Sequence, residues 1–318
     1  RRPVDLRIVV ANQITQITQL TQLTQLTQLL PNRLLDRLQR SRITPLRRAT
    51  NRSPGGHLAR KGGASTELAD FRDYAPGDDI RFIDWNSFSR LHRPYLKLFH
   101  QEEEMQVAVF IDASNSMLFE GKLNLAKQLA AVFGVLALRN PERLSMHVLG
   151  ANESAASQRM GRCAGRASLG KMFSFVEQIE GGGDAAFEQA TESALKHHKG
   201  KGVAVLLSDF LTFGDLSRPF NLLFSAGLQP MAIQILARSE IAPDVNGDLR
   251  MVDCEQLETL DVSSAGSLLD IYQEHLQSFQ DRLETLCRQR SGRFLCTGSD
   301  ADIELLVFDT LRRQGWIR

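Results

Sequence analysis

The chain of 318 residues is poor in cysteine, with four, and none of them stands in a Cys-x-x-Cys pair. A chain of this length needs no disulfide framework, and the isolated cysteines do not resemble a zinc site. The seven histidines include no His-Glu-x-x-His pair, which excludes the zinc-protease pattern. We therefore expect reduced thiols and a cytoplasmic protein.

The chain also lacks any run of eighteen apolar residues, so the sequence predicts no membrane-spanning segment. No cleavable apolar core follows the first residues, and we expect no secretory signal. Hydrophobic residues still make up 42% of the chain, which suffices for a sizeable core in one large domain or two ordinary ones.

Negative charge is scarce at the N-terminus. Residues 1–62 contain twelve Arg and Lys but only two acids, Asp5 and Asp36. A basic arm can touch nucleic acid, anionic lipid or an acidic partner. Because this arm is Arg-rich and free of aromatics, we favour a solvated leader and expect no specific nucleic-acid partner. Membrane contact by the arm is the less favoured alternative.

The leader also contains low-complexity sequence. Residues 14–30 repeat a Thr-Gln-Leu-like triplet, and the period of three matches neither a helix nor a strand. We assign this repeat no function. The sequence thus predicts a leader and linker over residues 1–64, flexible in part.

A denser segment follows, over residues 65–102. Aromatic and charged side chains alternate here around Pro76-Gly77, a pair typical of a tight turn. Such spacing suits a segment that docks through its aromatics and is held by ion pairs.

From about residue 103 to 318, strand-like and helical stretches alternate, which predicts an α/β fold with a Rossmann-like, doubly wound and mainly parallel sheet. The runs 107–111 and 203–207 are continuously apolar, as in central strands buried on both faces. An Asn246-Gly247 pair predicts an inserted hairpin near 244–263 at the sheet edge. Strands are expected at 105–112, 143–150, 202–209, 228–236 and 292–298.

Oxygen-bearing side chains follow the two central strands. Asp112, Ser114 and Ser116 come after the first, and Asp209 ends the second. Ligands of such sheets bind outside the carboxyl ends of the strands. We therefore predict a site for Mg²⁺ or Mn²⁺, which prefer oxygen ligands. One carboxylate and two hydroxyls leave the ion electron-poor, so it would accept an acid from a partner, which is binding rather than catalysis.

This pattern, Asp-x-Ser-x-Ser with a later strand-end Asp, resembles the metal-ion-dependent adhesion site of von Willebrand factor A domains. The resemblance implies a Rossmann-like sandwich and a third loop that supplies a Thr ligand. Gly183 stands where that Thr is expected. The neighbouring Asp184 is a weaker candidate ligand.

The segment "DFRDYAPGDDIRFIDWNSFSRLHRPYLKLF" closely resembles the signature of the bacterial "domain of unknown function 58" family, and the likeness can be followed over residues 65–318. It implies an adaptor or chaperone-like partner of a MoxR-type AAA+ ATPase, which would offer an acidic contact residue. The signature residues that we assign to partner binding or structure are Arg72, Tyr74, Asp78, Asp79, Arg81, Asp84 and Trp85.

Two alternatives to this non-enzymatic interaction module stay open. One is a metal-dependent phosphohydrolase that uses Asp112, although Ser114 stands where its general acid is expected. The other is a metal-free scaffold, in which the strand-end oxygens only cap helices.

Overall fold

The structure is a computed structural model that describes residues 29–46, 68–99, 104–150, 159–183, 187–196, 198–212, 214–243, 249–252, 259–262 and 269–318. The chain divides into two compact units. Arg1–Arg48 and Met105–Arg318 form the first, which we call the α/β unit, and Ala49–Glu104 form the second, which we call the signature unit. Each unit is described by itself.

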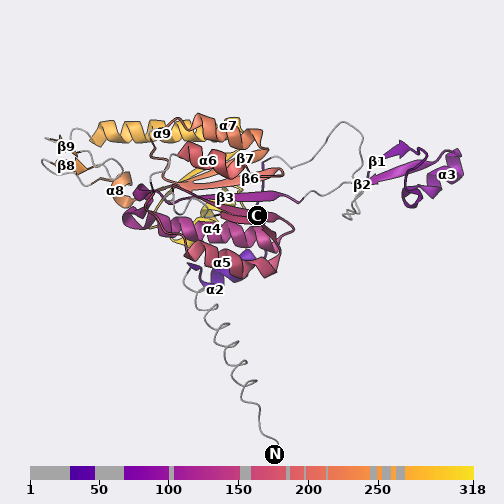
Figure 1. The fold of residues 1–318 in the computed structure, drawn as a ribbon, viewed down its shortest axis with the longest axis horizontal. Coiled ribbons are helices and arrows are strands. Elements are labelled where there is room, and N and C mark those ends of the chain that lie inside the picture. The colour runs from indigo at the N-terminus through magenta and orange to yellow at the C-terminus, as the bar shows by residue number, and fades with distance from the viewer. Residues whose placement is uncertain are drawn as a thin grey trace, which may run out of the picture. The chain divides into compact units, whose positions relative to one another are not determined.

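The α/β unit is built on a six-stranded sheet with the order β10-β7-β6-β3-β4-β5 (Figure 1). Every neighbouring pair is parallel except β4 and β5, which are antiparallel. The predicted α/β class with a mainly parallel sheet is confirmed, and the edge strand β5 is an addition. The six strands are β3 (Gln106–Asp112), β4 (Arg143–Leu149), β5 (Arg159–Ala164), β6 (Gly202–Ser208), β7 (Leu228–Leu236) and β10 (Arg293–Gly298).

Helices cover both faces of this sheet (Figure 1). One face carries α2 (Asn32–Leu38), α4 (Lys122–Arg139) and α5 (Leu169–Glu177), and the other carries α6 (Phe187–Leu195), α7 (Ser217–Ser225) and α9 (Leu269–Gln289). Two hydrophobic cores result. Val107, Val109 and Ile111 of β3 belong to one core, and Ala108 and Phe110 to the other, because successive side chains of a strand point to opposite faces. This layering is compatible with a Rossmann-like fold.

Shorter elements complete the α/β unit. A turn of helix, η2 (Asn115–Gly121), leads into α4, η4 (Arg166–Ser168) precedes α5, and α8 (Arg238–Ile241) follows β7. Near the end of the chain lie α10 (Ile303–Leu305) and η6 (Leu306–Leu311). Within the predicted hairpin segment, β8 (Leu249–Val252) and β9 (Thr259–Val262) pair antiparallel as a sheet of their own.

Among the described residues, one stretch is long and apolar enough to cross a membrane, Asn115–Arg139, although the sequence predicted no such segment. Its most apolar window is 72% buried inside the fold. The window is buried because α4 packs between the sheet and α5. The apolar character of this stretch therefore matches that of a core helix.

Part of the predicted leader belongs to the α/β unit. Leu30, Leu34 and Leu38 are fully buried in the core that lies under α4. Ile43 forms a β-bridge with Ile317, next to which the residues 42 and 318 exchange two backbone hydrogen bonds. Residues 1–28, with most of the Thr-Gln-Leu repeat, and residues 47–64 lie outside the described residues.

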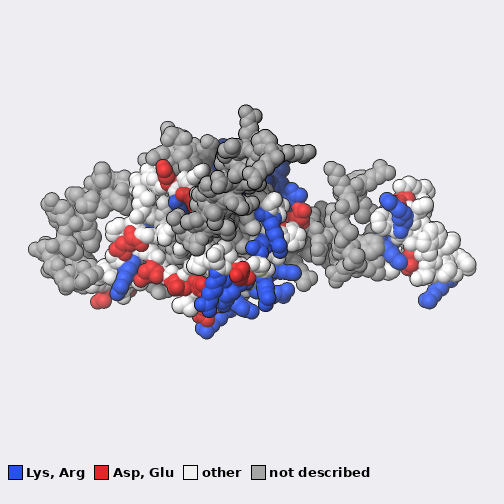
Figure 2. All heavy atoms as spheres, turned by 90° about the horizontal axis from the view of Figure 1, so that it is seen from below, with Lys and Arg blue, Asp and Glu red and all other residues white. Residues whose placement is uncertain are grey.

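The face that carries α2 is rich in basic side chains (Figure 2). Arg33 and Arg37 on α2, and Arg40 just after it, are exposed. The Arg37 guanidinium lies 3.7 Å from the centroid of the Phe308 ring and 3.6 Å from a carboxylate oxygen of Glu304. The described part of the basic arm is therefore a folded surface.

Burial raises the pKa of Glu142, which follows α4, to about 8, although the nearby Arg42 charge acts against this rise. Its Oε2 atom is buried and has no hydrogen-bond partner among the described residues. The folded state therefore binds the proton more tightly than the unfolded chain. This part of the stability should be lost as the pH rises from about 4.5 to about 8.

We predict that Glu142→Gln removes this pH dependence and raises the free energy of unfolding at pH 9 by about 2 kcal/mol, a figure reduced for the partial exposure of the group. Urea unfolding at pH 5 and pH 9 measures the free energy of unfolding of each variant and its change with pH. Glu284→Gln, on the exposed side of α9, is the matched control and should keep the wild-type dependence. Equal dependence in Glu142→Gln and the wild type would contradict the prediction.

Candidate functional site

The predicted ligand residues lie where β3 ends at the carboxyl edge of the sheet. Asp112 is the last residue of β3, Ser114 is the N-cap residue of η2, and Ser116 is the second residue of η2. Ser114 forms a parallel β-bridge with Gly183, and the N–H of Asn115 donates to the Gly183 carbonyl at 3.2 Å. The loop that contains Gly183 therefore lies against Ser114 and Asn115.

Asp112 is buried and has two neutral donors. Its Oδ1 accepts the N–H of Ser114 at 2.9 Å, and its Oδ2 accepts the hydroxyl of Ser208 at 2.5 Å. Burial, together with the charge of nearby Asp209, raises the pKa of Asp112. The charged form is thus disfavoured here, and a cation next to this carboxylate would stabilise it.

The two serine hydroxyls lie together, with 3.0 Å between Ser114 Oγ and Ser116 Oγ. Adjacent ligands of an octahedral Mg²⁺ ion, each about 2.1 Å from the metal, lie about 3 Å apart, so this spacing fits two ligands of one ion. Ser114 is the N-cap residue of η2, but its side chain makes no capping hydrogen bond. The hydroxyl therefore does not serve as the helix cap of the metal-free alternative.

Asp209, the fourth predicted ligand, takes part in an ion pair. Its Oδ2 accepts from Lys122 Nζ at 2.8 Å, and its Oδ1 accepts the N–H of Leu211 at 3.1 Å. Lys122 also donates to Glu240 Oε1 at 2.7 Å. Asp209 is near enough to Asp112 to affect its pKa, but its own charge is balanced by a lysine.

A glycine allows the loops to approach at this edge. Gly150, just after β4, has φ +69°, and a Cβ there would lie 3.0 Å from Ser114 N and 3.3 Å from Asp112 Oδ1. A side chain at position 150 would therefore press on the candidate ligands. Gly183 offers no side-chain ligand, and Asp184 lies outside the described residues.

Three residues of this site were missed by the sequence analysis: Ser208, Lys122 and Glu240. The register offers a signal for Ser208, because Ile111 pairs with Leu207 and the next residues of β3 and β6 are then neighbours. Lys122 and Glu240 are 118 residues apart, and no spacing rule connects them.

The signature unit contains the antiparallel pair β1 (Leu68–Asp73) and β2 (Tyr95–Phe99), with η1 (Ile80–Phe82) and α3 (Trp85–Leu91) between them. Its charged residues are largely paired with each other. Arg72 lies 2.6 Å from Asp78, and Arg81 lies 2.6 Å from Asp79. These predicted signature residues thus hold the turn between β1 and η1.

Asp84 has a similar structural role. Its carboxylate accepts the N–H of Asn86 at the start of α3, accepts the Ser87 hydroxyl at 2.6 Å, and lies 3.2 Å from Lys97 Nζ. The Ser87 hydrogen bond, with Lys97, lowers the pKa of Asp84. Asp84 therefore connects α3 to β2.

Several large apolar side chains of the signature segment are exposed, although Ile83 and Leu96 are buried. Trp85 is 60% exposed, its ring packs edge-on against Phe88, and Leu91 and Ile80 are exposed to a similar extent. Tyr74 is half-buried. Exposed large apolar side chains of this kind are available for a partner.

We predict that Asp84→Ala frees the start of α3, because it removes the cap together with the Ser87 and Lys97 contacts. Local stability should fall by about 1–2 kcal/mol. Hydrogen exchange of the amides of residues 86–91 measures this loss. Asp73→Ala, at the exposed end of β1, is the control and should leave the exchange unchanged; equal protection in both variants would contradict the structural role.

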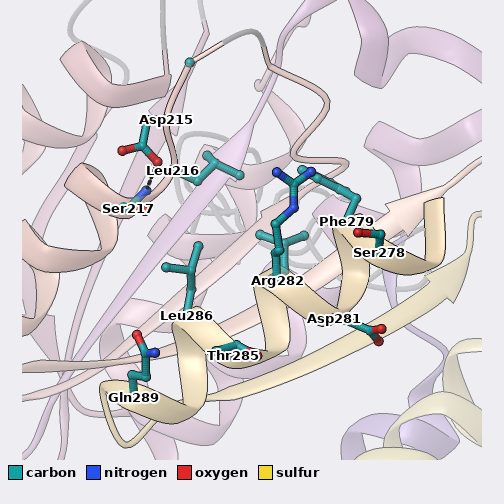
Figure 3. A pocket seen from close by; sticks show the side chains of 12 residues that line it. Asp215, Leu216, Ser217, Ser278, Phe279, Asp281, Arg282, Thr285, Leu286 and Gln289 are labelled. Carbon is teal, nitrogen blue, oxygen red and sulfur yellow. Dashed lines mark hydrogen bonds between the residues drawn. The ribbon is translucent and has the colours of Figure 1, made fainter. Parts of the chain in front are cut away.

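A separate hollow of about 700 Å³ lies between the loop 214–217 and α9 (Figure 3). Figure 3 shows Leu286 rising from α9 toward Leu216 of the loop. Nearby, the Arg282 guanidinium lies 5.6 Å from the centroid of the Phe279 ring. The hollow shares no lining residue with the strand-end cluster, and we assign it no part in the candidate site.

The geometry defines an α/β protein with an oxygen-rich site at the carboxyl edge of its sheet and a separate signature unit. Residues 70–278 match the family described as "Protein of unknown function DUF58", and the chain belongs to this family. It is 26% identical over 269 residues to "Uncharacterized protein Mb1516" of Mycobacterium bovis and to "Uncharacterized protein Rv1480" of Mycobacterium tuberculosis. These alignments cover 82% of this chain and 84% of each relative.

Solved structures show a more distant likeness. The "conserved hypothetical protein BatB" of Bacteroides thetaiotaomicron is 12% identical with a TM-score of 0.41, over 66% of this chain and 98% of that one. An "aerotolerance-related membrane protein" of Bacteroides fragilis is 14% identical with a TM-score of 0.39, over 66% and 97%. An "Uncharacterized Membrane Spanning Protein" of Vibrio fischeri is 15% identical with a TM-score of 0.22, over 67% and 100%.

The cytoplasmic location predicted from the sequence is contradicted by this comparison, because two of these neighbours are named as membrane proteins, and we withdraw it. The prediction rested on unpaired cysteines and on the absence of a long apolar run. Neither feature distinguishes a protein free in the cytoplasm from one held at a membrane.

Proposed function

We propose that the α/β unit is a metal-dependent protein-interaction module of the von Willebrand factor A kind, which binds Mg²⁺ or Mn²⁺ through Asp112, Ser114 and Ser116. It would act without catalysis, as an adaptor or chaperone-like partner of a MoxR-type AAA+ ATPase. The observation that carries the proposal is the pair of hydroxyls 3.0 Å apart beside a buried carboxylate whose two donors are neutral.

The donor set suits a hard divalent ion, since it consists of one carboxylate and two hydroxyls. Such an ion would stabilise the charge of Asp112 and present an electron-poor face to a carboxylate of the partner. This is the chemistry the ion would supply when bound. The protein's own part is to hold the three oxygens at the edge of a rigid sheet.

The proposed ATPase partner rests on the resemblance of the signature segment. The charged signature residues hold the turn and cap helices, while Trp85, Phe88 and Leu91 remain exposed. Trp and other large apolar side chains dominate the energetics of protein interfaces. We therefore assign partner contact to these exposed side chains, together with the ion site.

Titration with Mn²⁺, followed by electron paramagnetic resonance, tests the ion site. We expect saturable binding of one ion by the wild type and a loss of affinity on the order of 10- to 100-fold in Asp112→Ala and in Ser114→Ala. The controls are Asp215→Asn, at an exposed turn, and Ser145→Ala, at a buried position in β4. Equal, non-saturating binding by all variants would sink the proposal.

The same variants separate binding from catalysis. Turnover of a generic phosphoester by the purified protein, abolished by Asp112→Ala, would favour the phosphohydrolase over the interaction module. We expect no such turnover.

We predict that Asp112→Ala and Trp85→Ala each weaken binding to a purified MoxR-type ATPase by about 10-fold or more. Biolayer interferometry at constant Mg²⁺ and nucleotide measures the affinity. Leu305→Ala removes an equally exposed apolar side chain of the α/β unit and is the control. Wild-type affinity in both test variants would reject this partner.

A further inference from the structure

Lys122, the first residue of α4, is fully buried. Lysine is almost never fully buried unless it is paired. Here the ammonium group has two carboxylate partners, Asp209 Oδ2 at 2.8 Å and Glu240 Oε1 at 2.7 Å. The buried ammonium group is therefore stabilised by two ion pairs at the carboxyl edge of the sheet.

The position of the ammonium group is held from several sides. Glu240, on α8, uses its second oxygen to accept the N–H of Ala237 at 2.6 Å. The hydroxyl of Tyr272, on α9, donates to the Glu240 carbonyl at 2.6 Å. These contacts hold Glu240, so Lys122 is held between two fixed carboxylates.

Because of this arrangement, the two strand-end acids of the candidate site, Asp112 and Asp209, differ in how their negative charge is balanced. Asp209 gives one carboxylate oxygen to Lys122 and the other to the N–H of Leu211, so both already have donors. Asp112 has only neutral donors, Ser208 and the N–H of Ser114. Of these two acids, Asp112 is therefore the one whose negative charge is not balanced by a cationic side chain among the described residues.

We propose that Lys122 is a positioning residue that keeps Asp209 out of the ion's first coordination shell and balances its charge. Asp112 is then the sole carboxylate ligand from this chain. A divalent ion at this site then stays short of negative charge, which is the condition under which it would bind the partner carboxylate of the proposed function. This inference rests on the proposed function, because it presumes that Asp112 binds an ion.

Mn²⁺ affinity, measured by electron paramagnetic resonance on the full chain, tests this role. Lys122→Met with Glu240→Gln removes the lysine without leaving Glu240 charged and unpaired. We expect this double variant to bind Mn²⁺ about tenfold more tightly than the wild type, because Asp209 becomes a free anion beside the site. A purely structural role of Lys122 would leave the affinity unchanged or lower it.

Asp209→Asn gives an independent test in a nearly isosteric variant. With Lys122 present, it should change the Mn²⁺ affinity by less than about threefold, since the lysine already balances that charge. In the Lys122→Met, Glu240→Gln background, the same substitution should abolish the gain, which makes the two effects non-additive. If the lysine variant fails to fold, Asp209→Asn alone decides.

Lys127→Met is the matched control, since Lys127 lies on the same helix and its Nζ donates to the Glu177 carbonyl at 3.3 Å. It should bind Mn²⁺ like the wild type. A loss of tenfold or more in Asp209→Asn, or wild-type affinity in the lysine variant, would overturn the role of Lys122 and leave the ion site intact. Absence of saturable binding in the wild type would instead overturn the proposed function, and this inference with it.

Discussion

The side-by-side ends of β3 and β6 are the constraint on which the candidate site depends. Both strands are buried along their whole length, and their parallel register pairs Ile111 with Leu207. The residues that follow, Asp112 and Ser208, emerge together at the same edge, where the Ser208 hydroxyl reaches Asp112. Because the strands are packed from both faces, this edge is where the polar side chains of both strands meet.

The acids of this protein differ in how their charge is balanced. In the signature unit, Asp78, Asp79 and Asp84 face arginine or lysine, and they hold a turn and cap helices. In the α/β unit, Asp209 faces Lys122. Asp112 differs from all of these, because its donors are an N–H and a hydroxyl. Because it is buried and has no cationic partner, its charged form is costly and its pKa is raised.

The two central strands were predictable because continuous apolar runs have one simple cause, burial on both faces. β5 was not, because "RMGRCA" forms an edge strand with mostly exposed side chains and lacks an apolar pattern. Helices were expected only as stretches that alternate with the strands, and bounds such as those of the short helix α7, "SRPFNLLFS", came from the structure. Short helices depend on tertiary packing more than on local signals.

The candidate site, like the fold, was predictable in its local part and not in its long-range contacts. Asp112, Ser114 and Ser116 lie within five residues, so their spacing alone brings them together. The contact between Lys122 and Glu240 joins elements 118 residues apart, and only the completed fold brings it about. The structural roles of Asp78 and Asp84 could not be predicted either, because a sequence does not distinguish an acid that stabilises a turn from an acid that binds a partner.

The bridge between Ile43 and Ile317 bears on how the chain folds as it is made. The helix α2 docks on α4, but the strand-like residues after it await residues 316–318, which are synthesised after every described strand and helix of the unit. Until then the nascent α/β unit has an unpaired backbone segment, beside a core that includes Trp316. The signature unit, inserted between Arg48 and Met105, is already synthesised by that time. Closure of the α/β unit thus follows the synthesis of its strands and helices, and such long-range pairing is slow.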